Sequence, residues 1–182
     1  MRVFLALMVS ALFFVACSSN RIYIVRHAEK SVSPANDPDL TPEGKARAEA
    51  LEKLLRKKDI QAIHSTNTRR TRQTAEPLAL ATGLPIQTYT NDSLLQFLYR
   101  VVDSEKNTLI VGHSNTVPRM LRELSLPATI QSIPDNDYDN LFVIIVKSKS
   151  GPAGYELKLK ERTYGKKSPN TRDTSRQVNR MQ

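Results

Sequence analysis

Residues 21–28 read Arg-Ile-Tyr-Ile-Val-Arg-His-Ala, and this stretch decides the fold. Its first five residues are mostly β-branched or aromatic and are flanked by polar positions, which predicts a short buried strand. Residues 108–112, Thr-Leu-Ile-Val-Gly, predict a second strand of the same kind. A histidine follows each strand: His27 comes just after the first, and His113 directly after the second.

Helical patterns separate the predicted strands. Thr41-Pro42-Glu43 predicts a helix start with a threonine cap and a proline at the first helical position, and this helix is expected to reach about Lys58. Other helices are expected over about 69–82, 92–102 and 115–124. The first of these should bend or restart at Pro77. Other strands are expected over 60–64, 86–89, 141–146 and 155–159. The alternation predicts a single α/β domain with three layers, α/β/α, around a mostly parallel central sheet.

The first twenty residues have the composition of an export signal. A positive start at Met1-Arg2 precedes an apolar run over 3–15, which is too short to span a bilayer comfortably. A small residue, Ala16, then precedes the lone Cys17, which resembles the lipobox of bacterial lipoproteins. This resemblance implies cleavage before Cys17 and its lipidation, and hence an exported, membrane-anchored lipoprotein on the periplasmic or outer-membrane side. An ordinary secretory signal or an uncleaved anchor is the alternative.

The positive charge is concentrated near the C-terminus. The net charge is +9, and residues 160–182 hold seven Lys or Arg against two acidic residues. The globular part is therefore not predicted to bind nucleic acid. Because residues 164–182 contain little to bury, we expect a disordered basic tail there. The predicted organisation is a signal peptide over 1–16, a lipid anchor and short tether over 17–20, a domain over 21–163, and this tail.

Both histidines are expected at one edge of the sheet, together with arginines. Ligands of open α/β sheets bind outside the carboxyl ends of the strands, where His27 and His113 lie. Arg26 precedes His27, and Arg69 and Arg70 begin a helix, a natural anion site. The planar donors of arginine match phosphate oxygens, and neutral imidazole can attack phosphorus. These residues predict an oxyanion pocket for which phosphate is the best fit.

Four segments resemble the motifs of the histidine phosphatase (phosphoglycerate-mutase-like) superfamily. They are Arg26-His27-Ala28, Leu-Thr-Pro-Glu-Gly at 40–44, Ser-Thr-Asn-Thr-Arg-Arg-Thr-Arg-Gln-Thr-Ala at 65–75, and Gly112-His113-Ser114. They follow the family's order and together cover about residues 21–125. The chain departs from the family at Ala28, where glycine is commoner, and at Thr71, where alanine is common. The resemblance implies the superfamily's fold.

The resemblance also implies roles for single residues. His27 would attack phosphorus and become phosphohistidine, which water would then hydrolyse. Arg26, Arg70 and His113 would bind the phosphoryl oxygens and stabilise the transition state, and Ser114 is a further candidate ligand. No metal and no organic cofactor would be needed. The expected function is a phosphatase acting on phosphomonoesters or related phosphoryl compounds, with a phosphorylated small molecule as substrate.

The general acid has no clear candidate. Many family members carry a glutamate after the second helix, but residues 89–102 contain no glutamate and one carboxylate, Asp92. Glu29, close to the nucleophile, and Asp103 are the other candidates. Without an acid, good leaving groups, as in acyl phosphates or phosphohistidine, would be favoured.

Two other classes of function stay open. A non-catalytic phosphate- or partner-binding lipoprotein on the same fold would also account for the missing glutamate. A metal hydrolase would have to use three histidines that form no close pair, so no metal site is expected, and His64 is expected to be structural. Phosphoglycerate mutase activity is disfavoured because the insertions that enclose a mutase site are missing.

Overall fold

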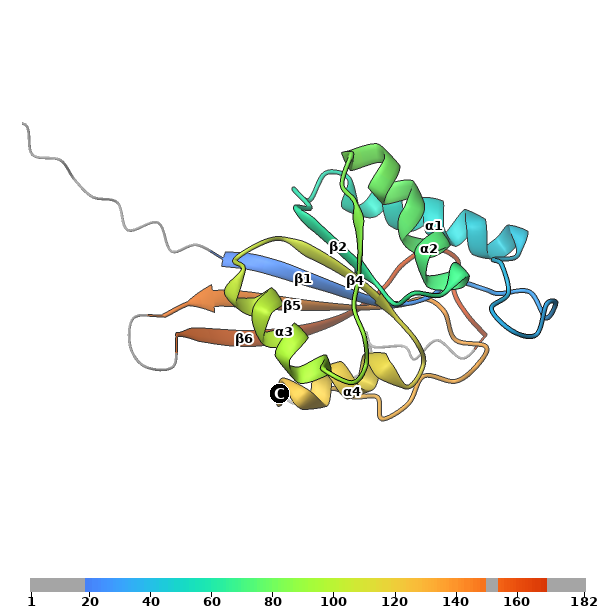
Figure 1. Ribbon diagram of the computed structural model, residues 1–182. Coiled ribbons are helices and arrows are strands. Elements are labelled where there is room, and N and C mark those ends of the chain that lie inside the picture. The colour runs from blue at the N-terminus through green and yellow to red at the C-terminus, as the bar shows by residue number, and fades with distance from the viewer. Residues whose placement is uncertain (1–18, 150–153, 170–182) are drawn as a thin grey trace, which may run out of the picture.

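The computed structural model describes residues 19–149 and 154–169, and a six-stranded sheet forms its middle layer (Figure 1). The strands are β1 (Ser19–Arg26), β2 (Ala62–Ser65), β3 (Ile86–Thr88), β4 (Thr108–Gly112), β5 (Asn140–Ser148) and β6 (Tyr155–Thr163). Their order across the sheet is β3-β2-β4-β1-β5-β6. The four strands from β3 to β1 pair in parallel, whereas β5 and β6 join antiparallel at the other side. The prediction of a mostly parallel sheet is confirmed.

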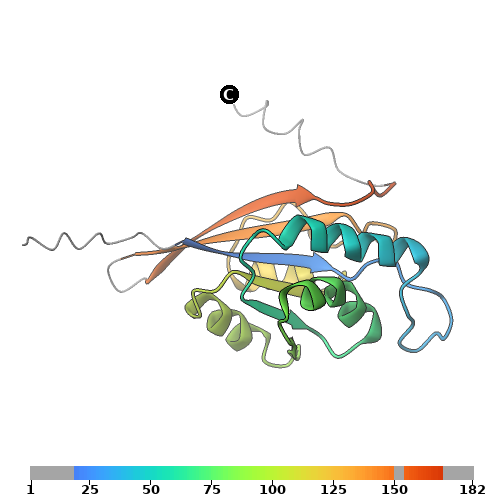
Figure 2. The same ribbon diagram turned by 90° about the horizontal axis from the view of Figure 1, so that it is seen from above.

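Helices cover both faces of this sheet. They are α1 (Pro42–Leu55), α2 (Arg69–Thr82), α3 (Leu94–Asp103) and α4 (Thr116–Glu123). Successive strand residues point to opposite faces, so Tyr23 and Val25 pack with α1 and α2, while Ile22 and Ile24 pack with α3 and α4. Figure 1 shows the two pairs of helices on opposite sides of β1, and Figure 2 shows β6 beyond β5 at one edge. The predicted three-layer α/β/α domain is confirmed.

The helix ends follow from local chemistry. Thr41 caps α1, because its side chain accepts a hydrogen bond from the backbone N–H of Gly44. That helix ends at Leu55 rather than near Lys58. Helix α2 runs as one element through Pro77 to Thr82, so the predicted restart there is wrong, and Gly83 caps its C-terminal end with a positive φ of 70°.

Residues 164–169 correct the predicted domain boundary. Tyr164 is 5% exposed within the core beneath α1, and Ser168 is 7% exposed. The buried Arg47 of α1 donates to the carbonyl oxygens of Tyr164 and Lys166 at 3.0 and 2.8 Å. The expectation of a disordered tail from residue 164 was wrong for this segment. The Tyr164 ring packs in the core, and the carbonyls of Tyr164 and Lys166 accept hydrogen bonds from α1. The remaining tail residues, 170–182, lie outside the described residues.

The predicted signal peptide and Cys17 also lie outside the described residues. Across residues 19–149 and 154–169, no helix is both long and apolar enough to cross a bilayer.

Candidate active site

The pairing of β1 with β4 brings the two histidines together. Arg26 lies opposite Gly112 in this parallel pair, so both chains leave the sheet at the same edge. The backbone N–H of His27 donates to the carbonyl of Gly112 at 2.9 Å, and the two imidazole centroids are 5.4 Å apart. A Cβ on Gly112 would come 2.9 Å from the Thr116 hydroxyl, so the start of α4 lies too close to Gly112 for a larger residue to fit without a shift.

His27 is held as a neutral imidazole with one free nitrogen. The side chain is 3% exposed, and its Nδ1 lies 2.8 Å from the carbonyl oxygen of Ala28. A carbonyl only accepts, so Nδ1 carries the proton and Nε2 keeps its lone pair. Burial lowers the pKa of His27 to about 3, and the charges of Arg26 and Arg70 act in the same direction. His27 is therefore neutral at pH 7, with Nε2 unprotonated.

His113 takes the opposite tautomer. Its Nδ1 faces Nη2 of Arg70 at 3.4 Å, and because a guanidinium only donates, Nδ1 is the acceptor. Its Nε2 then donates to the Thr66 hydroxyl at 2.9 Å. Burial, followed by the charge of Arg70, lowers the pKa of His113 to about 4. The hydroxyl of Thr116 accepts from the His113 backbone N–H at 2.8 Å and fixes the main chain there.

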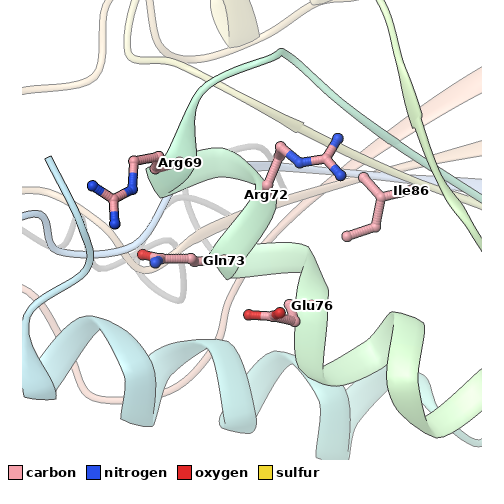
Figure 3. Close-up of a pocket in the computed structure, with 5 residues that line it drawn as sticks. All are labelled: Arg69, Arg72, Gln73, Glu76 and Ile86. Atoms are coloured by element: carbon pink, nitrogen blue, oxygen red, sulfur yellow. The ribbon is translucent and has the colours of Figure 1, made fainter. Parts of the chain in front are cut away.

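Arg70, at the start of α2, is the arginine of its helix that reaches this site. Its Nη1 lies 3.6 Å from the Asp37 carboxylate, and its buried Nε has no hydrogen-bond partner within the described part of the chain. Arg69 instead forms an ion pair with Asp39 at 2.8 Å. Arg69 and Arg72 line a separate pocket with two other residues of α2 and with Ile86 of β3, which Figure 3 shows.

Arg26 is buried at 3% exposure and is held by the loop between α4 and β5. Its Nη1 donates to the carbonyl oxygens of Pro134 and Asp137 at 2.6 and 3.1 Å. Its guanidinium carbon lies 4.4 Å from the ring centroid of Tyr138, a cation–π distance. Burial lowers the pKa of Arg26. Its Nε, like that of Arg70, is buried and has no hydrogen-bond partner among residues 19–149 and 154–169.

Residues 22–91 match the family model of the histidine phosphatase superfamily, branch 1. The structure of a mycobacterial glucosyl-3-phosphoglycerate phosphatase superimposes with a TM-score of 0.64 at 15% identity, covering 81% of this chain and all of that one. SixA from Nakamurella multipartitia gives 0.52 at 21% identity, covering 81% and 98%. The chain has the histidine phosphatase fold.

A third neighbour is the protein histidine phosphatase SixA in complex with tungstate, with a TM-score of 0.57 at 16% identity, covering 79% of this chain and 96% of that one. No curated protein sequence matches the chain. The sequence match covers residues 22–91, a range that includes His27 and Arg70, and the likeness to the solved structures shows the fold over most of the chain. His113 lies beyond the matched range, and β4 brings it to His27.

Two of the three carboxylates predicted as general acids are bound by another residue or lie away from this site. Both oxygens of Glu29 bind Arg47, at 2.8 to 3.0 Å, so this side chain is committed to an ion pair. Asp92 is exposed on the connection from β3 to α3, and because β3, β2, β4 and β1 are parallel, this connection leaves the sheet at the same edge as His27 and His113, so Asp92 stays a candidate. Asp103 ends α3 and precedes β4, which places it at the opposite edge of the sheet. The carboxylate beside Arg70 is Asp37, which lies on the loop after β1.

The sequence did not indicate the residues that hold the others in place. Thr74 accepts from the Ala28 backbone N–H at 2.9 Å and donates to the Arg70 carbonyl at 2.7 Å, so it ties the loop after β1 to α2. Thr66 orients the His113 ring. Tyr138 lies over Arg26 and 6.1 Å from the His27 ring centroid. The sequence marks Tyr138 only as an aromatic residue within an acidic run at 135–139. This run is not one of the four motifs that resemble the family.

The predicted phosphate ligand Ser114 follows His113 just before α4. Its backbone carbonyl accepts from the N–H of Ile133 at 3.5 Å, and its side chain is partly exposed. His64 lies within β2 and packs edge-to-face on Phe97, with 5.0 Å between the ring centroids. In the described part of the chain, no group of three or more His, Cys, Asp or Glu side chains could hold a metal ion.

Proposed function

We propose that this chain is a phosphatase that hydrolyses phosphomonoesters, or related phosphoryl compounds, through a phosphohistidine formed on His27. The observation that carries the proposal is the bond from Nδ1 of His27 to the Ala28 carbonyl. That bond leaves Nε2 with a lone pair, and the pKa of about 3 keeps it unprotonated at neutral pH. A buried neutral imidazole beside two arginines is an activated nucleophile for an anionic phosphoryl group.

The neighbouring donors support an oxyanion as ligand. The Nε groups of Arg26 and Arg70 are buried and have no hydrogen-bond partner in the described residues, a costly arrangement that phosphoryl oxygens would relieve. Solved structures of the mycobacterial glucosyl-3-phosphoglycerate phosphatase contain inorganic phosphate or VO3, and that of SixA contains tungstate. By analogy, we infer that the phosphoryl group of a small-molecule substrate lies between His27, His113 and these arginines.

The reaction then takes two displacement steps. The lone pair of Nε2 of His27 forms a bond to phosphorus as the bond to the leaving oxygen breaks, and the leaving group takes a proton from solvent. Water next attacks the phosphohistidine, the nitrogen–phosphorus bond breaks, and inorganic phosphate leaves. Arg26 and Arg70 stabilise the negative charge in both transition states, and His113 joins them when the bound anion raises its pKa and Nδ1 gains a proton, so the proposed reaction uses no metal and no organic cofactor.

We further propose that the chain is exported and held to the membrane by a lipid on Cys17, as its N-terminal pattern implies. Replacing the thiol removes the atom that carries the lipid. Cys17→Ser should therefore move the full-length protein from the membrane fraction of cells to the soluble fraction. An unchanged membrane fraction would contradict lipid anchoring.

The decisive experiment measures hydrolysis of p-nitrophenyl phosphate with and without a strong chelator. We expect activity that the chelator does not reduce, and that His27→Asn abolishes. His64→Asn is the matched control, because His64 packs on Phe97 away from the two other histidines, and it should retain activity. Native mass spectrometry should also find one added phosphoryl group on the natural chain and none on His27→Asn.

Activity that survives in His27→Asn would overturn the mechanism. Binding of inorganic phosphate without any turnover would instead favour the non-catalytic phosphate-binding alternative.

A further inference from the structure

We propose that residues 164–168, called here the C-terminal strap, position Arg26 for the reaction, and that Ser168 is the positioning residue through which they act. This inference rests on the proposed function. The strap follows β6, the last strand, and lies far along the sequence from the motifs that the chain shares with the histidine phosphatase superfamily.

One end of the strap is attached to the segment that follows His27. Arg47 donates to the carbonyls of Tyr164 and Lys166, and the same guanidinium binds both oxygens of Glu29, two residues beyond His27. Gly165 allows this approach: its φ is 66°, and a Cβ there would lie 3.1 Å from Nη1 of Arg47. Arg47, which is 4% exposed, thus holds the strap against the segment that follows His27.

The other end of the strap is attached to the loop that holds Arg26. The Ser168 hydroxyl accepts from the backbone N–H of Tyr138 at 2.9 Å. The Ser168 backbone N–H donates to the Asp139 carboxylate at 2.8 Å, and the Tyr164 N–H donates to the Asp139 carbonyl at 2.9 Å. Three hydrogen bonds therefore fix Tyr138 and Asp139 against the strap.

Tyr138 passes this constraint to Arg26. Its ring lies against the guanidinium, 4.4 Å from the guanidinium carbon, while the carbonyls of Pro134 and Asp137 bind Nη1. These contacts, with the Asp135 carboxylate 3.6 Å from Nη2, hold Arg26 and leave Nε without a hydrogen-bond partner among the described residues. The same ring is 6.1 Å from the His27 imidazole. Ser168 thus acts on Arg26 and His27 through one intermediate residue, Tyr138.

A misplaced donor slows the reaction more than it destabilises the fold, because phosphoryl transfer depends on donors already aimed at the developing charge. Ser168→Ala removes the acceptor of the Tyr138 N–H and leaves the strap's contacts with Arg47 in place. We expect kcat/KM for p-nitrophenyl phosphate to fall about tenfold, with a matching rise in the inhibition constant of orthovanadate, since a buried donor loses its partner.

Two matched variants test whether the hydroxyl itself is responsible. Ser168→Thr keeps a hydroxyl acceptor and should restore both constants to within about twofold of the natural chain. Ser148→Ala makes the same change at the exposed end of β5 and should leave both constants unaltered.

A double-mutant cycle in the full chain tests whether Ser168 acts through Tyr138. If the strap acts through Tyr138, adding Ser168→Ala to Tyr138→Ala should change the vanadate inhibition constant by less than about twofold. A full tenfold loss in that background would overturn the inference, and so would Ser168→Ala behaving like Ser148→Ala in an active enzyme. A natural chain without activity would overturn the proposed function and this inference with it.

Discussion

At the scale of single residues, the site depends on which nitrogen of each imidazole carries the proton. The Ala28 carbonyl puts the proton of His27 on Nδ1, while Arg70 puts that of His113 on Nε2. The two rings therefore each present an unprotonated nitrogen, one as the proposed nucleophile and the other toward an arginine. Neither assignment depends on titration near neutral pH, because burial keeps both rings neutral.

Nuclear magnetic resonance of the imidazoles tests these proton positions directly. Since the pKa of His27 is about 3 and that of His113 about 4, the signals of both rings should not shift between pH 8 and pH 6. The nitrogen shifts of His27 should report a protonated Nδ1. Saturating phosphate should raise the pKa of His113, because an anion beside Arg70 stabilises the charged imidazole. A midpoint near the ordinary value of 6.5 for His27 in the empty site would contradict the burial argument.

Asp37 competes with a bound anion for Arg70 in the empty site. Its carboxylate lies 3.6 Å from Nη1 of Arg70 and also accepts from the Arg69 backbone N–H at 2.8 Å. Asp37→Asn keeps a side-chain oxygen that can accept from the Arg69 N–H, and asparagine tolerates the positive φ of 55°. The substitution removes only the charge. Inorganic phosphate should then inhibit about two- to fivefold more strongly, on the order of a partly exposed ion pair.

The matched control for that measurement is Asp103→Asn, which removes an exposed charge at the end of α3, at the opposite edge of the sheet, and should leave the inhibition constant unchanged. Weaker inhibition in Asp37→Asn would show that this carboxylate supports anion binding instead of opposing it.

The sequence located the two histidines and the arginines of the site, because strand ends and helix starts determine where such residues lie. It did not locate their partners. Glu29 was a candidate acid by its nearness to His27, but Arg47, eighteen residues away, binds both of its oxygens. Side-chain partners depend on how separate elements pack, and spacing along one segment carries no information about that packing.

At the scale of elements, the sequence predicted the strands and helices better than their ends. Apolar runs and the Thr41 cap correctly predicted β1, β4 and the start of α1. Pro77 was expected to interrupt its helix, yet α2 continues to Thr82, with buried residues before and after the proline. Packing against the sheet outweighs the lost backbone hydrogen bond.

The first turn of α1 lies against the loop that carries the site, and this contact can be tested at Gly44. A Cβ there would lie 2.1 Å from the Glu29 carbonyl oxygen, so Gly44→Ala must push α1 away from residues 28–29. We expect a loss of about 3 kcal/mol of unfolding free energy in urea, with reduced hydrolysis in the folded fraction.

Gly83→Ala provides the matched comparison at the other type of glycine. Gly83 has a φ of 70°, and a Cβ added there would meet no atom within 4 Å. Backbone strain alone should therefore cost about 1 kcal/mol, and activity should be unchanged. Equal losses in the two variants would show that the contact with Glu29 is not tight.

At the scale of the whole molecule, the strand order explains why distant segments share one site. β1 lies between β4 and β5, so the chain ends of β1 and β4 meet on one side, and the loop before β5 reaches Arg26 from the other. The hydrogen bonds of residues 164–168 with this loop and with α1 were not foreseeable from composition. Their polar sequence indicates disorder. In the folded chain, however, the buried Arg47 donates hydrogen bonds to the carbonyls of Tyr164 and Lys166.

The burial of three imidazoles makes the stability of the whole domain depend on pH. The pKa values of His27, His64 and His113 are about 3, 4 and 4 in the folded protein, below the ordinary value of 6.5. Between these values the unfolded chain binds more protons than the folded one, so stability rises with pH up to about 6.5 and levels off above it. Each histidine adds up to about 1.4 kcal/mol per pH unit in this window.

Urea unfolding at about pH 8.5, 7.5, 5.5 and 5.0 should therefore give a nearly constant free energy at the first two values and a steep fall at the last two. Carboxylates contribute little there, because their ordinary pKa values lie lower. His64→Asn removes one of the three groups without touching the proposed nucleophile, and it should reduce the slope by about a third. A free energy that stays constant down to pH 5 would mean that the histidines take up protons in the folded state, and would remove the physical basis for a neutral His27.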